Sequence, residues 1–326
     1  MQSTRQSVPL IQAMTEIRYR TPAILFVALV ASQQTLHPSA RSCVASTALP
    51  GAGVIIYGGA RACGADVVND SAVWSWSGGQ WKPHSTLPLP PREDALLVAD
   101  DRRLWLFGGR RHGTAFDDIW LHEANAWRRV TASGGPGAIQ HGAAAMDRRR
   151  NRIVVFGGAV GRSRDARTFE WDGTRWHVFD VPGPAARVAH GMAWSDADGG
   201  VLLYGGFSER EMFRDLWRWD GARWTQLSSE GPTHTEGPIT EAPSGVYIIG
   251  AGLNAAASAP VKTWQWTGGR FAEIPASGRP SRIGAMTVFD RTRGVLMLFG
   301  GADDGGRPDA SMWEFDGTRW RNTTAR

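Results

Sequence analysis

Arginine is the residue type in this sequence that is best suited to bind a ligand through charge. The chain has 326 residues and a formal net charge of +5, and Lys82 and Lys262 are its only lysines. A guanidinium group forms paired hydrogen bonds with carboxylates and sulfates, so arginines gathered on one surface would bind an anion. A GC-rich genome explains the excess of arginine equally well. The predicted ligand-binding residues are Arg61, Arg110, Arg162, Arg187, His190, Arg214 and Arg282.

No arrangement of residues in the sequence indicates a particular reaction. The eight histidines are spread along the chain without the close spacing of a zinc or iron site, so we expect no metal. The sequence also has no Gly-x-Ser-x-Gly elbow, phosphate-binding loop or dinucleotide fingerprint. We therefore expect no cofactor and no nucleophilic, phosphoryl-transfer or hydride chemistry.

The N-terminal part of the chain has the features of an export signal of bacterial type. An apolar stretch of ten residues, 22–31, follows Arg18 and Arg20 and precedes small and polar residues. This length suits a signal peptide, whereas a spanning helix needs about 20 apolar residues. We predict a leader over residues 1–32, a linker over 33–40, and a periplasmic or extracellular mature chain without an integral membrane span. A disordered N-terminal extension is the alternative.

The two cysteines of the chain, Cys43 and Cys63, would both remain after removal of the leader. In an exported protein, two such thiols in one structural unit form a disulfide readily. They would pack equally well as two separate, small apolar side chains. Both alternatives stay open at the level of the sequence.

A repeated apolar run that ends in two glycines shows how the chain is organised. The first glycines of successive copies lie 50, 49, 48, 45 and 50 residues apart. One copy has alanine in place of the second glycine of the pair. A period of this length is typical of β-propeller blades. The copies end at Gly58-Gly59, Gly108-Gly109, Gly157-Gly158, Gly205-Gly206, Gly250-Ala251 and Gly300-Gly301.

Each run is followed by two aromatic residues that are seven positions apart. Turn residues such as Asp220-Gly221 lie between them in five of the copies, and such residues favour a tight hairpin. We expect each hairpin to form the outer part of a blade, with the rings of the pair wedged between blades. The pairs are Trp74 and Trp81, Trp120 and Trp127, Phe169 and Trp176, Trp217 and Trp224, Trp264 and Phe271, and Trp313 and Trp320.

This combination of a strand ending in Gly-Gly and two spaced aromatics resembles the kelch repeat, as in the central domain of the galactose oxidases. The resemblance covers residues 41–326 and implies an all-β fold, a six-bladed β-propeller with four antiparallel strands in each blade. No blade alone can bury both of its faces, so the ring must close. The expected blades span residues 41–87, 91–132, 138–181, 187–229, 235–275 and 281–326, each complete, although residues 33–40 could add a closing strand.

The resemblance also bears on the charged residues. In such a propeller the loops after Gly-Gly and the loops between blades open on one face, which is the default ligand site. An arginine shortly before an inner strand, such as Arg187, resembles a kelch position that bridges blades structurally. Asp118, Asp215 and Asp309 are expected to be turn residues or to pair with such arginines.

Two enzyme families have the same fold, and each would require particular residues in this chain. The copper-radical galactose oxidases need a tyrosine linked to a cysteine, but Tyr57, Tyr204 and Tyr247 lie inside expected strands. Resemblance to the periplasmic sialic-acid mutarotases would give acid–base roles to Glu209 and Glu211 and a carboxylate-binding role to Arg214.

The sequence therefore favours an exported, non-catalytic binding propeller. Its arginine-rich loop face would take an acidic protein, a glycan or a small carboxylate. The alternatives are a mutarotase-like enzyme acting on a sugar acid, and a structural protein without a soluble ligand. Removal of residues 1–32 takes away three arginines and one glutamate and lowers the formal charge from +5 to +3, which is too mild and too scattered to indicate nucleic-acid binding.

Overall fold

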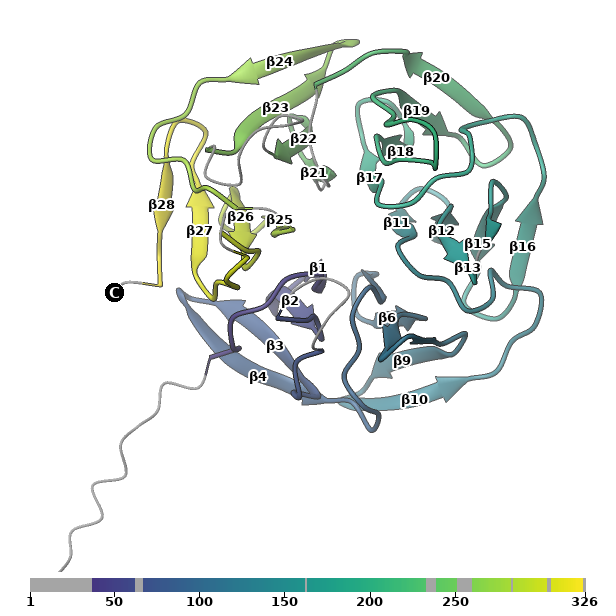
Figure 1. Cartoon of the computed structure of the whole chain (residues 1–326), viewed down its shortest axis with the longest axis horizontal. Coiled ribbons are helices and arrows are strands. Elements are labelled where there is room, and N and C mark those ends of the chain that lie inside the picture. Colours follow the sequence, from purple (N-terminus) through teal and green to yellow (C-terminus); the bar gives the residue numbers. More distant parts are fainter. Residues whose placement is uncertain are drawn as a thin grey trace, which may run out of the picture. The chain divides into compact units, whose positions relative to one another are not determined.

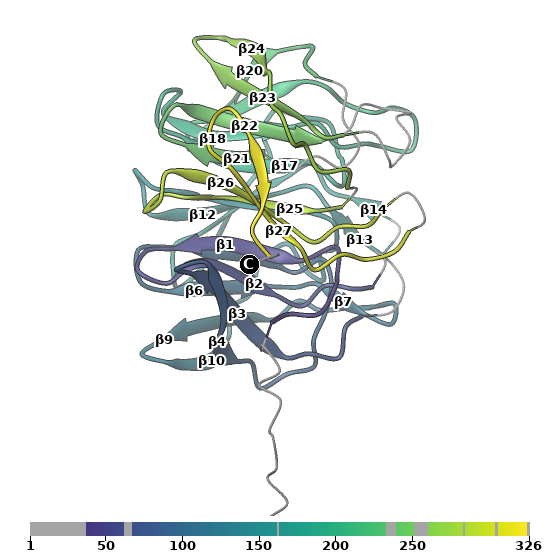
Figure 2. The ribbon, with the colours of Figure 1, turned by 90° about the vertical axis from the view of Figure 1, so that its left-hand side faces the viewer.

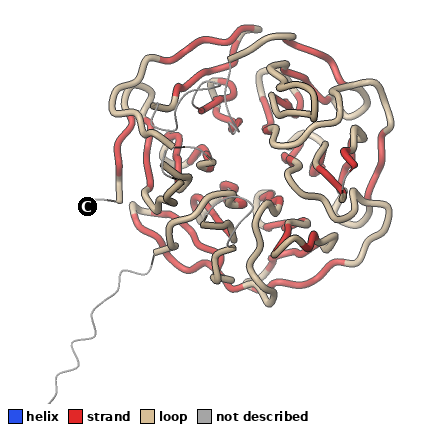
Figure 3. Tube along the Cα trace, viewed as in Figure 1, coloured by secondary structure: helices blue, strands red, loops and turns tan. Residues whose placement is uncertain are grey.

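Six four-stranded antiparallel sheets are arranged around an axis in the computed structural model (Figure 1). The structure describes residues 37–61, 67–161, 163–232, 239–250, 260–282, 284–303 and 306–324. These residues belong to one compact unit, and strands are their only regular elements. Figure 3 shows the strands and the loops that join them. The prediction of a six-bladed, all-β propeller is confirmed.

The first three blades follow one another along the chain. Blade 1 consists of β1 (Ala45–Leu49), β2 (Gly53–Tyr57), β3 (Ala72–Ser77) and β4 (Gln80–Thr86). Blade 2 consists of β5 (Leu96–Ala99), β6 (Leu104–Phe107), β9 (Ile119–Glu123) and β10 (Ala126–Val130), with a small hairpin of β7 (Arg110–Arg111) and β8 (Thr114–Ala115). Blade 3 consists of β11 (Ala143–Asp147), β12 (Arg152–Phe156), β15 (Thr168–Trp171) and β16 (Trp176–Phe179), with a hairpin of β13 (Ala159–Val160) and β14 (Ser163–Arg164).

The last three blades have the same strand order. Blade 4 consists of β17 (Gly191–Ser195), β18 (Gly200–Tyr204), β19 (Leu216–Trp219) and β20 (Trp224–Ser228). Blade 5 consists of β21 (Ile239–Ala242), β22 (Gly245–Gly250), β23 (Lys262–Thr267) and β24 (Arg270–Ile274). Blade 6 consists of β25 (Met286–Asp290), β26 (Val295–Phe299), β27 (Met312–Phe315) and β28 (Trp320–Asn322).

Hydrophobic packing between neighbouring blades holds the ring together. The described residues form six buried clusters, and each cluster takes its side chains from two adjacent blades. One of them joins Val54 and Ile56 of blade 1 to Met297 and Phe299 of blade 6 and so closes the ring. The first and last blades are complete without a strand from residues 37–40, as expected, and Figure 2 shows β1 and β27 from the side.

The aromatic pairs pack in or against the buried clusters between blades, as expected, and the register of each hairpin adds a further residue. In each outer hairpin the second aromatic lies opposite the residue that is two positions after the first aromatic, because the tight turn fixes this register. In blade 4 the fully buried ring is therefore Trp219, which faces Trp224 at a centroid distance of 5.4 Å. Trp217 is half-buried, and its Nε1 donates a hydrogen bond to Asp215 over 2.7 Å.

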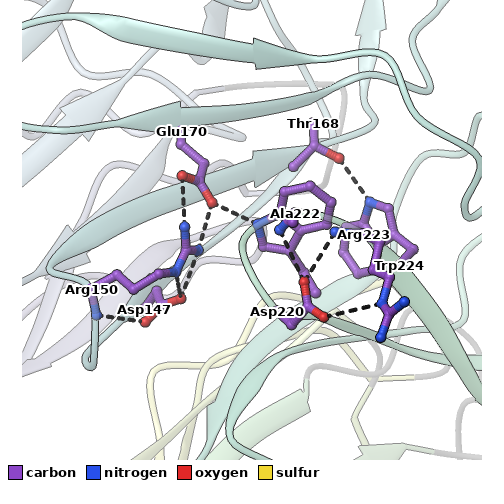
Figure 4. A network of polar contacts seen from close by, with 9 residues as sticks. Asp147, Arg150, Thr168, Glu170, Asp220, Ala222, Arg223 and Trp224 are labelled. Carbon is purple, nitrogen blue, oxygen red and sulfur yellow. Dashed lines mark hydrogen bonds and ion pairs between the residues drawn. The ribbon is translucent and has the colours of Figure 1, made fainter.

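A polar network crosses the seam between blades 3 and 4 (Figure 4). The buried Glu170 carboxylate accepts hydrogen bonds from Arg150 Nη1 at 3.0 Å and Nη2 at 2.6 Å. It also accepts one from Trp219 Nε1 of the next blade at 2.6 Å. Trp224 Nε1 donates to the Thr168 hydroxyl at 2.8 Å across the same seam. These bonds satisfy polar groups that would otherwise be costly to bury.

Candidate functional site

The segments before the inner strands and the segments after Gly-Gly lie together on one face of the propeller, here called the loop face. Backbone bridges join them in four blades, between Ser42 and Ala60, between Glu93 and Arg110, between Gln140 and Ala159, and between Val188 and Phe207. The expected placement of these loops on a common face is confirmed.

A ring of residues with left-handed backbone surrounds the axis on the loop face. At one repeat position, directly before the inner strand region, φ is 52° at Cys43, 56° at Asp94, 54° at His141 and 54° at Ala189, and blade 6 has Gly284 with φ 66°. Residues other than glycine rarely adopt such angles, and when they do they are found in tight turns and at functional sites. All five residues line one cavity, here called the axial cavity.

The axial cavity has a volume of about 320 Å³. Its wall consists largely of alanine, glycine, leucine and methionine from the inner strands, including Leu97, Met192 and Met286. The charged and titratable groups in the wall are Asp94, His141 and His190. A cavity with both apolar side chains and a few polar groups in its wall suits a small ligand.

Asp94 is the acidic residue of the axial cavity, and only 8% of its side chain is exposed. Its Oδ2 accepts a hydrogen bond from Arg110 Nε at 2.9 Å and lies 3.4 Å from His141 Nε2. Arg110 Nε is also 3.4 Å from the buried carboxylate of Glu93. The predicted arginine Arg110 therefore stands behind the rim of the cavity and fixes the orientation of Asp94.

His190 belongs to the wall of the axial cavity and has a structural role. Its Nε2 lies 3.1 Å from the carbonyl oxygen of Phe156, so this nitrogen carries the proton. Burial lowers the pKa of His190 to about 3 and keeps the ring neutral. A Cβ atom on Gly157 or Gly206 would approach the His190 side chain to within 2.6 or 2.8 Å, so these glycines make room for it.

Arg187 and Arg282 each pair with an aspartate of their own blade. The fully buried Arg187 donates to Asp215 Oδ1 at 2.6 Å, to Asp215 Oδ2 at 3.0 Å and to the Gly205 carbonyl at 2.9 Å. Its own carbonyl accepts from Gly158 N of blade 3 at 2.8 Å. Arg282 likewise pairs with Asp309. The expected pairing of Asp118, Asp215 and Asp309 with such arginines is confirmed, and the partner of Asp118 is Arg92. Arg41 and Asp70 form a further pair of the same kind.

The residues proposed for acid–base chemistry do not meet in a cavity. Glu209 pairs with Arg164 of blade 3 at 2.8 Å, and 76% of its side chain is exposed. Arg214 pairs with Glu230 at 3.0 Å. Glu211 is exposed, and neither glutamate nor Arg214 lines the axial cavity. Their positions on the loop face give no common pocket for a sugar acid.

Of the remaining predicted residues, Arg61 is described by the structure, whereas Arg162 and Cys63 are not. Arg61 is exposed, and its guanidinium has no side-chain partner among the described residues. Arg162 and Cys63 lie outside the described residues. The predicted disulfide of Cys43 with Cys63 therefore stays a prediction.

Sequence reasoning missed two exposed apolar side chains on the loop face, Val160 of blade 3 and Met212 of blade 4. Their exposed fractions are 39% and 45%, and Val178 is the other large hydrophobic residue exposed in the described part of the chain. The Arg164–Glu209 ion pair joins the two loops. Arg210, two positions before Met212, is exposed, and its guanidinium has no partner within the described ranges.

Ion pairs cross the far end of the central channel. There Glu241 of blade 5 pairs with Arg148 of blade 3 and, at 3.1 Å, with Arg291 of blade 6. Arg148 and Glu241 line a narrower space of about 120 Å³ that continues along the inner strands. At its loop-face end the channel therefore has Asp94, His141 and His190 among small and aliphatic side chains, whereas its end on the opposite face is ion-paired.

Two further points concern metal binding and membrane crossing by the described residues. In the described part of the chain, no group of three or more His, Cys, Asp or Glu side chains is arranged to hold a metal ion. Those residues also contain no helix long and apolar enough to cross a membrane.

Comparison with known proteins gives a weak relationship to plant proteins. No family model matches the chain. Two proteins of Oryza sativa subsp. japonica, Adagio-like protein 1 and putative adagio-like protein 2, are each 27% identical to it over 186 residues. The matched part is 47% of this chain and 28% of each relative, so the chain spans less than a third of the length of these curated relatives.

Proposed function

We propose that this chain is a non-catalytic binding propeller that takes an acidic segment of another protein on its loop face. The observation that carries the proposal is the exposure of the apolar side chains of Val160 and Met212, in two loops that an ion pair joins. Arg210, two positions before Met212, has no partner within the described ranges. Exposed apolar side chains next to a charged group are typical of protein interaction sites. The six-bladed ring supplies a rigid support for such loops.

Charge distinguishes the proposed partner from other ligands. Arg164, Arg167, Arg214 and Arg307 of the same face each pair with a neighbouring carboxylate, which reduces their pull on an anion. Arg210 and Arg61 have no such partner within the described ranges, so they are the arginines available to an acidic segment. The exposed apolar side chains favour a peptide with both acidic and apolar side chains over a glycan or a small carboxylate.

The enzyme hypothesis requires Glu209 or Glu211 within hydrogen-bonding distance of Arg214 inside a central pocket. Glu209 and Arg214 have other partners, at 2.8 and 3.0 Å, and stand outside the axial cavity. A binding role is therefore the function that the described geometry supports best.

We also propose that the chain is exported through a leader over residues 1–32, which lie outside the described residues. The support is the apolar stretch after Arg18 and Arg20. Mass analysis of the protein recovered outside the cytoplasm should show loss of the leader and a Cys43–Cys63 bridge. An intact N-terminus with two free thiols in that protein would contradict this proposal.

Fluorescence anisotropy with a labelled peptide of alternating glutamate and leucine tests the binding role. At low salt the full chain should bind this peptide, and the double change Arg210→Ser/Met212→Ser should raise the Kd by about tenfold or more. Arg102→Ser removes an exposed arginine from the β5–β6 turn and is the matched control, which should bind as the unchanged chain does. Absence of binding, or an equal Kd for both variants, would overturn the proposal.

A further inference from the structure

The axial cavity differs in chemistry from the arginine-bearing loops around it. Asp94 is the acid in its wall, and no arginine or lysine is among the described residues that line it. The remaining wall is formed mainly by small and aliphatic side chains of the inner strands. A carboxylate or an acidic peptide would meet the Asp94 carboxylate here, and Arg110, which already pairs with Asp94, is not part of the wall, so this cavity does not suit the ligand proposed for the loops.

The Asp94 carboxylate is held in place and still has a free oxygen. Arg110 Nε and His141 Nε2 approach Oδ2, at 2.9 and 3.4 Å, whereas Oδ1 makes no hydrogen bond with any described residue. Arg110 divides its charge between Asp94 and Glu93, which lies 3.4 Å from the same nitrogen. A carboxylate that its partners orient in advance binds a cation without the cost of ordering its own side chain.

The size of the cavity limits the ligand. About 320 Å³ is near the lower end of the range for small-molecule sites, which begins at about 300 Å³. This space accepts one side-chain-sized group, and Leu97, Met192 and Met286 offer apolar surface to a hydrocarbon stem. Long cationic groups bury such stems while their charged ends form hydrogen bonds.

From these observations we infer that the axial cavity is a second binding site, for a single ammonium or guanidinium group on an apolar stem, with Asp94 Oδ1 as the acceptor of its hydrogen bond. The site is independent of the acidic-segment surface proposed above, because it uses other residues and the opposite ligand charge. The cation can belong to a basic side chain of a partner protein or to a free organic amine.

Asparagine at position 94 gives a variant that keeps the fold. Asp94 has φ 56°, and asparagine is among the few residues that accept this backbone conformation readily. Asp94→Asn therefore removes the charge and leaves the ring geometry. Asp94→Ala is less suitable, because alanine tolerates the left-handed region poorly and would confuse loss of charge with strain.

Isothermal titration of the full chain with butylguanidinium and with butyrate tests the inference, because the two probes share a stem and differ in charge. The chain should bind butylguanidinium and not butyrate, and Asp94→Asn should weaken butylguanidinium binding about tenfold or more. Arg210→Ser should leave this binding unchanged. Equal binding of both probes, no binding of butylguanidinium, or an unaffected Asp94→Asn variant would overturn the inference.

Two further binding experiments identify the source of the cation and distinguish the two sites. A peptide with a single arginine that displaces butylguanidinium would assign the site to a protein partner, and one that fails to do so would assign it to a free amine. Asp94→Asn should still bind the glutamate–leucine peptide. Loss of that binding would show that the two sites are one and would contradict the inference without contradicting the proposed function.

Discussion

Buried arginines contribute to the stability of this chain. Arg187 is fully buried, makes two hydrogen bonds to Asp215 and one to the Gly205 carbonyl, and stacks over Phe213 at 3.8 Å. Such a guanidinium satisfies a carboxylate and a strand-end carbonyl together. Removal of one partner of a buried ion pair leaves the other uncompensated.

Arg187→Ala should therefore lower the free energy of unfolding by about 3–5 kcal/mol, because Asp215 and the Gly205 carbonyl lose their partner. Urea denaturation checks this value. Arg61→Ala is the matched control, since Arg61 is exposed and unpaired within the described part, and it should change stability by less than about 0.5 kcal/mol. Equal losses for the two variants would contradict the structural role of Arg187.

Buried histidines should make the propeller sensitive to mild acid. Burial lowers the pKa of His190 to about 3 and lowers the pKa of His84 and His122, the last also through the charge of His84. The unfolded chain then binds more protons below its histidine pKa of 6.5 than the folded chain does. The stabilisation is complete above about pH 6.5 and is lost as the pH falls toward the folded-state values.

Between pH 7 and pH 5 the free energy of unfolding should thus fall by about 2 kcal/mol from His190 alone, at about 1.4 kcal/mol for each pH unit below 6.5. Carboxylates with lowered pKa, such as Asp118, lose their contribution only below their unfolded value near 3.8, so this window isolates histidine. Chemical denaturation at the two pH values measures the change. The same stability at both values would rule out neutral burial of these rings.

Sequence reasoning at the residue scale predicted the arginine–aspartate pairs and missed the axial rim. Arg92 and Arg187 recur at one repeat position and have aspartates at similar distances along the chain, so a pattern was visible. The rim position two residues later holds Cys43, Asp94, His141, Ala189 and Gly284 in different blades. Side chains of such different types give no recurring signal, although they share one backbone conformation.

At the element scale, the outer hairpins form the seams between blades. Five blades have an aromatic residue opposite the second repeat aromatic, and blade 2 has His122 there. His122 lies with its ring 5.2 Å from that of His84 on the neighbouring blade and 5.0 Å from that of Trp127. The sequence showed the spacing of seven residues, but the facing pair depends on hairpin register, which spacing alone does not determine.

Trp219→Ala should lower the free energy of unfolding by about 3–5 kcal/mol, because it opens a cavity in a fully buried seam and leaves Glu170 without one donor. Trp217→Ala is the matched change on the same strand and should cost about 1–2 kcal/mol, since that ring is half-buried and loses one hydrogen bond. Thermal or urea unfolding measures both. A larger loss for Trp217→Ala would show that the hairpin register is wrong.

At the scale of the whole molecule, closure between blades 1 and 6 makes the six sheets one folding unit. Val54 and Met297 pack in the closing cluster, and Arg41 bonds to blade 6 through its backbone. The repeat period predicted this ring because each sheet has two apolar faces to cover. The period did not predict the ligand, because the Gly-Gly runs and aromatic seams repeat in every blade, whereas Arg210, Met212 and Asp94 are particular to single loops.

Amide hydrogen exchange of the full chain, with and without the glutamate–leucine peptide, tests the central claim that the loop face is the binding surface. The account predicts slower exchange in the loops around Val160 and Met212, and unchanged exchange in the turns on the opposite face, such as Asp220–Arg223. Protection confined to those turns, or no protection at all, would contradict it.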